Sequence, residues 1–177
     1  GARIEVVGLH ELKIDTTDIT SWETPYSLVA QMRASTAVLG PLISRFGKAV
    51  VAMPGGCNIG ARKIDMHILG LEALGVEFKV EHGNIHASAP HGITGETVSL
   101  AFASVGATEN LMMASVFAKG VTVIDNAARE PEIVDLANML NKMGANIQGA
   151  GSPVIEIHGV TELHPVEHEV VGDRIEA

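Results

Sequence analysis

Aromatic residues, cysteine and positive charge are all scarce in this sequence of 177 residues. Aromatic residues make up 3% of the chain, whereas 46% of it is hydrophobic, so its core must be built from aliphatic side chains. The single cysteine, Cys57, excludes an internal disulfide and a cysteine-rich zinc site. Lys and Arg number 12 against 21 Asp and Glu, and a chain with a formal charge of −9 and no basic stripe is unsuited to nucleic acid.

Several kinds of segment are missing as well. No apolar run reaches the length of about 18 residues that a membrane span needs, and the N-terminus lacks the basic and apolar regions of a signal peptide. We therefore expect a cytoplasmic protein with no membrane partner. The eight histidines are not spaced as metal ligands, and the chain has neither a Walker loop nor a dinucleotide fingerprint. These absences predict no metal site and no cofactor.

What the chain does contain is internal repetition. A glycine followed by two short β-rich runs around a glycine-containing turn occurs three times, and each occurrence predicts a hairpin. The glycines that open these hairpins are Gly1, Gly75 and Gly144. Helical patterns at 64–74 and 132–143 precede the second and third hairpins.

A second layer of repetition lies upstream of these helices. Helical patterns at 33–46 and 105–119 each end near a glycine and lead into an apolar strand, and a strand at 96–100 opens the later unit. Each complete unit is therefore predicted to contain helix, strand, helix and hairpin. No helix precedes Gly1, so we expect the chain to begin inside a larger protein.

The repeats also locate an insertion. The distance from Gly47 to Gly75 is 28 positions, whereas the matching distance from Gly120 to Gly144 is 24. The four extra residues fall in the loop Pro54-Gly-Gly-Cys-Asn-Ile-Gly-Ala-Arg62, which holds the only cysteine. A loop that departs from its own repeat is where function tends to reside.

The chemistry of this loop favours an anionic ligand. Arg62 and the helix predicted to start near Ile64 offer a cation and free N–H groups, and both stabilise a thiolate. Cys57 is then suited to donate a proton or to attack carbon, on a loop whose glycines permit closure. The alternative is that Cys57 is a small buried hydrophobe, the usual fate of a free cysteine.

Other candidate residues have a structural explanation beside a functional one. Arg33, near a helix start, can face an anion or be solvated. The segment 104–110 offers hydroxyls and backbone N–H groups, but an ordinary N-cap explains it as well. The segment 126–132, with a proline and acidic residues, is typical of a helix start. His67 is the only histidine close to Cys57 in the sequence, and it leaves open a thiol enzyme that uses a histidine base.

The stretch PGGCNIGARKIDMH at 54–67 resembles the enolpyruvyl transferases that act on UDP-N-acetylglucosamine, a branch of the EPSP synthase superfamily. The cysteine loop and NAAREPEIVD are distinctive of this branch, because the branch that forms the shikimate-pathway ester lacks such a loop. Further matching stretches between Pro25 and Ala177 are MRASTAVLGPL, LGLEALG, SVGATEN, NAAREPEIVDLANML and DRIEA.

The resemblance implies an α/β fold of the α+β type. The family's domain is an inside-out α/β barrel of three βαβαββ units, with helices inside and sheets outside, and two such domains make up the protein. We expect this chain to be a partial cysteine-loop domain over 1–177. Its expected parts are the hairpin of a truncated first unit at 1–20, a second unit at 21–91, and a third unit with the crossover to the absent second domain at 92–177.

The resemblance also implies an activity. The family transfers enolpyruvyl from phosphoenolpyruvate to the 3′-hydroxyl of UDP-N-acetylglucosamine and releases phosphate, the first committed step of peptidoglycan synthesis. Cys57 matches the catalytic loop thiol, which protonates the enolpyruvate carbon or assists product release and is the target of fosfomycin. The residues that match substrate-binding positions are Arg33, Arg62, Lys63, Ile64, Asp65, Met66, Ser104, Val105 and Gly106.

Two positions depart from the family pattern. Lys63 stands where the family usually has proline, and Phe102 stands where many members carry lysine. The family's Lys-Asn pair, its carboxylate base and a further arginine come from parts that this chain does not contain, so we expect the isolated chain to be largely inactive. The alternative from another class is a non-catalytic domain that is structural or binds ligand weakly.

Overall fold

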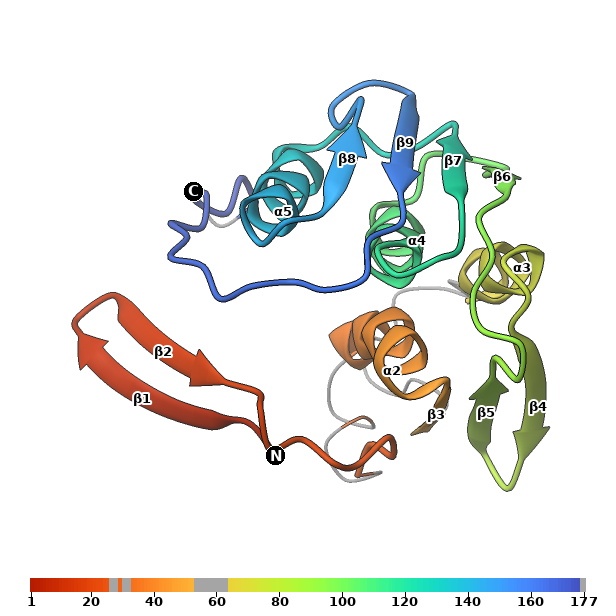
Figure 1. Ribbon diagram of the computed structural model, residues 1–177, viewed down its shortest axis with the longest axis horizontal. Coiled ribbons are helices and arrows are strands. Elements are labelled where there is room, and N and C mark those ends of the chain that lie inside the picture. Colours follow the sequence, from red (N-terminus) through yellow and green to blue (C-terminus); the bar gives the residue numbers. More distant parts are fainter. Residues whose placement is uncertain (26–28, 30–32, 53–63, 176–177) are drawn as a thin grey trace.

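The structure, a computed structural model, describes residues 1–25, 29, 33–52 and 64–175 (Figure 1). Its C-terminal half holds one full βαβαββ unit. The elements of this unit are β6 (Thr97–Ser99), α4 (Val105–Ser115), β7 (Val121–Asp125), α5 (Pro131–Lys142), β8 (Asn146–Gln148) and β9 (Val154–His158). The strand order is β6-β7-β9-β8, with β6 parallel to β7 and the other pairs antiparallel.

The preceding part of the chain repeats this arrangement with a reduced first strand. Its elements are η1 (Arg33–Val38), α2 (Leu39–Phe46), β3 (Lys48–Ala52), α3 (Asp65–Ala73), β4 (Glu77–Glu81) and β5 (Asn84–Ser88). The order β3-β5-β4 corresponds to β7-β9-β8. In the place of β6, Glu23 makes a parallel bridge to Val50, and the Thr24 N–H donates to the Val50 carbonyl at 3.0 Å.

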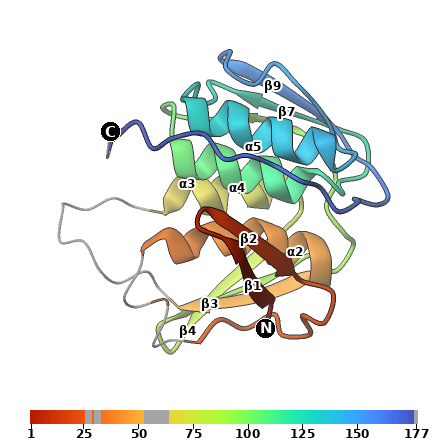
Figure 2. The ribbon, with the colours of Figure 1, turned by 90° about the vertical axis from the view of Figure 1, so that its left-hand side faces the viewer.

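The helices lie inside and the sheets outside, which confirms the predicted α/β fold (Figures 1 and 2). Helix α4 packs against both α2 and α3, and a glycine permits the close approach at each contact. A Cβ atom built on Gly40 of α2 would lie 2.4 Å from the Asn110 carbonyl oxygen of α4. A Cβ atom on Gly70 of α3 would lie 2.8 Å from a methyl carbon of Leu111. The largest fully buried side chains of the described residues are aliphatic or methionine, as the composition predicts.

The predicted helical segment at 33–46 is present, but it divides into two helices of different type. Residues Arg33–Val38 form a 3-10 helix, and the α-helix begins only at Leu39. Pro41 has no N–H, so it is accommodated in the first turn of an α-helix but not in the middle of one. The predicted helix at 105–119 also ends early, at Ser115.

The N-terminal hairpin of β1 (Arg3–Gly8) and β2 (Glu11–Asp15) stands apart from the helices (Figure 1). Its register places Ile4 opposite Ile14 and Val6 opposite Leu12, so these four side chains share one face. Their exposure lies between 58% and 74%. The hairpin therefore presents an apolar face that no described residue covers.

The C-terminal segment 159–175 returns along α5 (Figure 2). The His164 N–H donates to the Met143 carbonyl at 2.7 Å, and Nε2 of His168 lies 2.9 Å from Oδ1 of Asp135.

No helix formed by the described residues combines the length and apolarity needed to cross a membrane.

Candidate functional site

The predicted site residues fall into a described and an undescribed group. Cys57, Arg62 and Lys63 lie outside the described residues, so their predicted roles stay predictions. The backbone of Arg33 begins η1, and the remaining candidates lie at the starts of α3 and α4.

The start of α4 is capped as the sequence predicts. Ser104 has extended backbone angles, φ −103° and ψ 119°, and its hydroxyl accepts from the Ala107 N–H at 3.4 Å. The carbonyl of Ser104 accepts from the Thr108 N–H at 2.9 Å. The N–H groups of Val105 and Gly106 lie in the first turn, where no carbonyl of the same helix can reach them. Together with the helix dipole, these groups make this end of α4 suitable for an anion.

The start of α3 is anchored from within the core. Ile64 is 8% exposed, and its carbonyl accepts from the His67 N–H at 3.0 Å. Asp65 is exposed in the first turn, and Met66 is half-buried. Burial of Ile64 fixes where α3 begins, directly after the residues 53–63 that lie outside the described part of the chain.

The two helix starts lie side by side. A Cβ atom on Gly106 would lie 3.2 Å from Cε1 and 3.4 Å from Nε2 of His67. The imidazole ring of His67 on α3 therefore packs against the first turn of α4, and the absence of a side chain at Gly106 leaves room for it. The structure thus brings together the segments 64–66 and 104–106, which the sequence predicts separately.

Asn110 ends the segment 104–110, but its sequence context did not predict the role that its side chain has in the structure. Its side chain is fully buried and contacts three elements. The Nδ2 amide donates to the Thr36 carbonyl of η1 at 2.8 Å, and Oδ1 accepts from the Gly40 N–H of α2 at 2.7 Å. Nδ2 also lies 2.8 Å from Nδ1 of His67 on α3. An amide directly before the apolar run LMMA at 111–114 of a helix was the available signal, because a buried amide requires hydrogen-bond partners.

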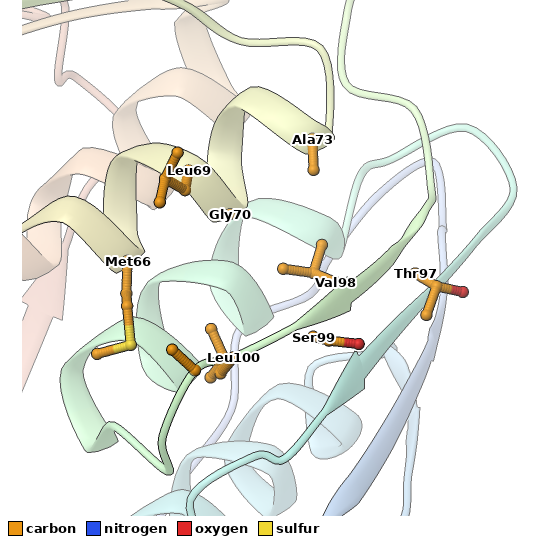
Figure 3. A pocket seen from close by; sticks show the side chains of 9 residues that line it. Met66, Leu69, Gly70, Ala73, Thr97, Val98, Ser99 and Leu100 are labelled. Carbon is orange, nitrogen blue, oxygen red and sulfur yellow. The ribbon is translucent and has the colours of Figure 1, made fainter.

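A cavity of about 240 Å³ borders the site at Met66 (Figure 3). Side chains of α3, β6 and the residues after β6 line it, and they are mostly apolar. The cavity is lined by Met66, Leu69, Gly70, Ala73, Thr97, Val98, Ser99, Leu100 and Ala101. The described residues of its wall include no charged group, so this part of the cavity suits an apolar or neutral moiety rather than a phosphate. Phe102, which follows it, is 63% exposed.

Two carboxylates near the α4–α5 contact have shifted pKa values. Burial raises the pKa of Glu109 on α4, and the charge of Glu132 on α5 raises it further. The hydrogen bond from the Arg174 guanidinium lowers the pKa of Glu132, and Nη2 of Arg174 lies 3.0 Å from Oε1 of Glu132.

The described residues contain no group of three His, Cys, Asp or Glu side chains placed to bind a metal ion.

His67 bears on the alternative of a histidine base. Its Nδ1 accepts from the Asn110 amide, so taking a proton at that nitrogen would break a partly buried hydrogen bond. This arrangement disfavours His67 as the base of a thiol enzyme.

Similarity to known proteins extends over the whole chain. The family described as EPSP synthase (3-phosphoshikimate 1-carboxyvinyltransferase) matches residues 1–177. UDP-N-acetylglucosamine 1-carboxyvinyltransferase 1 of Staphylococcus aureus strain N315 is 56% identical over 164 residues, 93% of this chain and 39% of that protein. UDP-N-acetylglucosamine 1-carboxyvinyltransferase 2 of Carboxydothermus hydrogenoformans is 58% identical over 167 residues, 94% of this chain and 40% of that protein.

Solved structures share the fold. The enolpyruvyl transferase NikO from Streptomyces tendae aligns with a TM-score of 0.82 at 24% identity, over 99% of this chain and 42% of that chain. An EPSP synthase from Acinetobacter baumannii aligns with a TM-score of 0.62 at 20% identity, over 93% of this chain and 37% of that chain. The present chain spans about two fifths of the length of the relatives that it matches.

Proposed function

The chain belongs to the EPSP synthase (3-phosphoshikimate 1-carboxyvinyltransferase) family, and on that premise we propose that it is part of an enzyme acting on UDP-N-acetylglucosamine. The proposed reaction transfers enolpyruvyl from phosphoenolpyruvate to the 3′-hydroxyl of the sugar and releases phosphate. The observation that carries this choice of substrate is the identity of 56% to 58% with proteins named UDP-N-acetylglucosamine 1-carboxyvinyltransferase. The solved structures, at 24% identity or less, support the fold alone.

The geometry of the described residues supports a site for anions. Both proposed substrates are anionic, and the chain has a formal charge of −9, so binding requires local positive groups. The first-turn N–H groups of Val105 and Gly106 are such groups, next to the start of α3 at Ile64. In the proposal, cationic side chains bind the substrates together with these N–H groups, and they belong to Arg33, Arg62 and Lys63.

The chemical roles follow from the reaction. In the proposal the sugar hydroxyl adds to C2 of phosphoenolpyruvate and gives its proton to the carboxylate base that the resemblance assigns to other parts of the protein, while C3 receives a proton from the Cys57 thiol. The Cys57 thiolate then takes a proton back from C3 as phosphate leaves C2, which forms the enolpyruvyl ether. Positive groups around the phosphate and carboxylate stabilise the charge that develops in both steps.

The proposal includes the organisation of the protein. The hairpin at 1–20, the unit at 21–91 and the unit at 92–177 would form part of the cysteine-loop domain, with a second domain supplied by residues beyond this chain. Because the resemblance assigns a Lys-Asn pair, a carboxylate base and an arginine to other parts, the isolated chain is expected to bind substrate without efficient turnover. A cytoplasmic location and a role in peptidoglycan synthesis belong to the same proposal.

Calorimetric titration of the folded chain with UDP-N-acetylglucosamine tests the substrate assignment. We expect saturable binding and negligible phosphate release when phosphoenolpyruvate is added. Absence of binding by a chain that is folded by circular dichroism would contradict the assignment, and it is the result that an inert structural domain predicts. Turnover at rates typical of complete enzymes would contradict the expected inactivity.

Alkylation tests the role of the thiol. Iodoacetamide and fosfomycin are expected to modify Cys57 in the native chain, as detected by intact-mass spectrometry, with Cys57→Ser as the unreactive control. Modification only after denaturation would favour the buried-cysteine alternative. Replacement of His67 by alanine is expected to leave the alkylation rate unchanged, whereas a large decrease would favour the thiol–histidine alternative.

A further inference from the structure

We infer that Asn110 is a positioning residue for the proposed substrate site. Its carboxamide joins η1, α2 and α3 to α4, and it holds His67 with the ring proton on Nε2. The functional part of this inference rests on the proposed function, because it assumes that the segments around Arg33, Ile64 and Ser104 line the substrate. The structural part stands on the hydrogen bonds of Asn110 alone.

The side chain of Asn110 occupies a break in a neighbouring helix. In a continuous α-helix, the Gly40 N–H would donate to the Thr36 carbonyl four residues earlier. Here the Asn110 amide bonds both groups, with Oδ1 accepting from Gly40 at 2.7 Å and Nδ2 donating to Thr36 at 2.8 Å. A side chain from α4 therefore replaces a backbone hydrogen bond at the point where η1 becomes α2. This connection fixes the position of η1, which begins at Arg33.

The backbone partners determine the orientation of the amide. A backbone N–H can only donate and a carbonyl can only accept, so the atom facing Gly40 is the oxygen and the atom facing Thr36 is the nitrogen. The second hydrogen of this nitrogen points to Nδ1 of His67, 2.8 Å away. Nδ1 must therefore be an acceptor, and neutral His67 carries its proton on Nε2.

The tautomer matters because of where the other edge of the ring lies. The Cε1–Nε2 edge of His67 rests against Gly106 in the first turn of α4. The protonated Nε2 therefore lies next to the first turn of the helix that is proposed to hold an anion. Asn110 acts on the site only through His67 and through the backbone of η1.

Asn110→Asp is the sharpest test because it keeps the shape of the side chain. One carboxylate oxygen can still accept from Gly40, but the other oxygen cannot donate to Nδ1 of His67. His67 is then expected to place its proton on Nδ1, either as the other neutral tautomer or as the cation. The exposed Asn138 of α5 provides a matched control, since Asn138→Asp adds the same charge without touching the site.

Nitrogen-15 NMR of the histidine rings reports the tautomer in the 177-residue chain without any ligand. In the unsubstituted chain and in Asn138→Asp, His67 is expected to show a protonated Nε2 and an unprotonated Nδ1. In Asn110→Asp, Nδ1 is expected to be protonated, while a cooperative thermal transition shows that the chain is folded. A protonated Nδ1 in the unsubstituted chain, or no change in Asn110→Asp, would overturn the inference.

Binding of UDP-N-acetylglucosamine tests the functional part by calorimetry. Asn110→Asp is expected to weaken binding by about tenfold or more, and Asn138→Asp by less than about twofold. Equal affinity of Asn110→Asp and the unsubstituted chain would overturn the positioning role. If the unsubstituted chain does not bind this ligand at all, the proposed function fails, whereas the tautomer measurement still decides the structural part.

A second pair of variants is independent of the folding of Asn110→Asp. In His67→Asn, the new Oδ1 lies where Nδ1 was and can accept from the Asn110 amide, whereas His67→Leu offers no acceptor. We expect His67→Asn to retain the higher affinity of the two. Equal losses in both variants would show that the acceptor for Asn110 has no role in binding.

Discussion

Replacement of Gly40 by alanine tests the contact between α2 and α4 directly. The new Cβ atom would lie 2.4 Å from the backbone carbonyl oxygen of Asn110 and 2.8 Å from its Oδ1. Neither atom can move freely, because the first belongs to the backbone of α4 and the second accepts the Gly40 N–H at 2.7 Å. Helix α2 must therefore move away from α4, and this hydrogen bond must lengthen or break.

The size of the effect follows from three contributions. Overpacking of a tight contact costs about 1–3 kcal/mol. Leaving a buried donor or acceptor without its partner costs about 1–3 kcal/mol more. The better helix propensity of alanine offsets up to about 1 kcal/mol of this. The net loss in the free energy of unfolding is about 3 kcal/mol, which corresponds to a decrease in Tm of about 6–12 °C for a domain of this size.

Thermal unfolding followed by circular dichroism measures this decrease, and two other glycines provide controls. Gly172→Ala is expected to leave Tm unchanged, because no atom lies within 4 Å of the added Cβ. Gly70→Ala is expected to have an intermediate effect, because its Cβ meets a side-chain atom of Leu111 at 2.8 Å rather than backbone. If Gly40→Ala unfolds at the same temperature as Gly172→Ala, the described contact between α2 and α4 is wrong.

Further predictions concern charge and the exposed hairpin. Because burial and the charge of Glu132 raise the pKa of Glu109, the native chain binds this proton more tightly than the unfolded chain does, and the stabilisation from protonation is lost as pH rises through the raised pKa. Glu109→Gln should therefore raise Tm at about pH 7 and have no effect near pH 4, and an equal effect at both values would contradict this reasoning. Arg174→Gln should return the pKa of Glu132 toward its ordinary value in a carbon-13 NMR titration, since the Arg174 hydrogen bond is the main cause of its decrease. The apolar hairpin face should promote self-association of the isolated chain, so Ile4→Lys should lower the mass seen by sedimentation, whereas Lys13→Gln on the opposite face should not; a monomeric unsubstituted chain would show that this face needs no cover.

The order of the elements could be predicted from the sequence because the determinants are local. Alternating apolar residues and turn glycines mark the hairpins, and the glycines after the helices have the left-handed backbone that ends a helix. Gly47 follows α2 with φ 68°, and Gly144 follows the cap of α5 with φ 108°. The repetition of these signals at matched positions also agrees with the repeated βαβαββ units that the family resemblance implies.

The change of helix type within 33–46, which the sequence did not predict, has a non-local cause. The apolar spacing there fits a continuous helix, and Pro41 was the only local sign against it. The partner that occupies the break, Asn110, lies 70 residues from Gly40 in the sequence. Periodicity within a window of one helix carries no information about a side chain that arrives from another unit.

The same limit applies to the candidate site. The sequence identifies the segments that begin at Arg33, Ile64 and Ser104 one at a time, each from its own motif. What brings the starts of α3 and α4 together and ties η1 to them is the body of α4, whose Asn110 bonds Thr36 and Gly40 and whose Leu111 meets Gly70. The alignment of the helix starts therefore depends on contacts one to two turns inside the bundle. There the Asn110 amide fits only because position 40 is a glycine, so neither residue reveals the contact by itself. For this reason a substitution in the buried part of α4 is expected to alter ligand binding as strongly as a substitution at a helix start, although it touches no substrate.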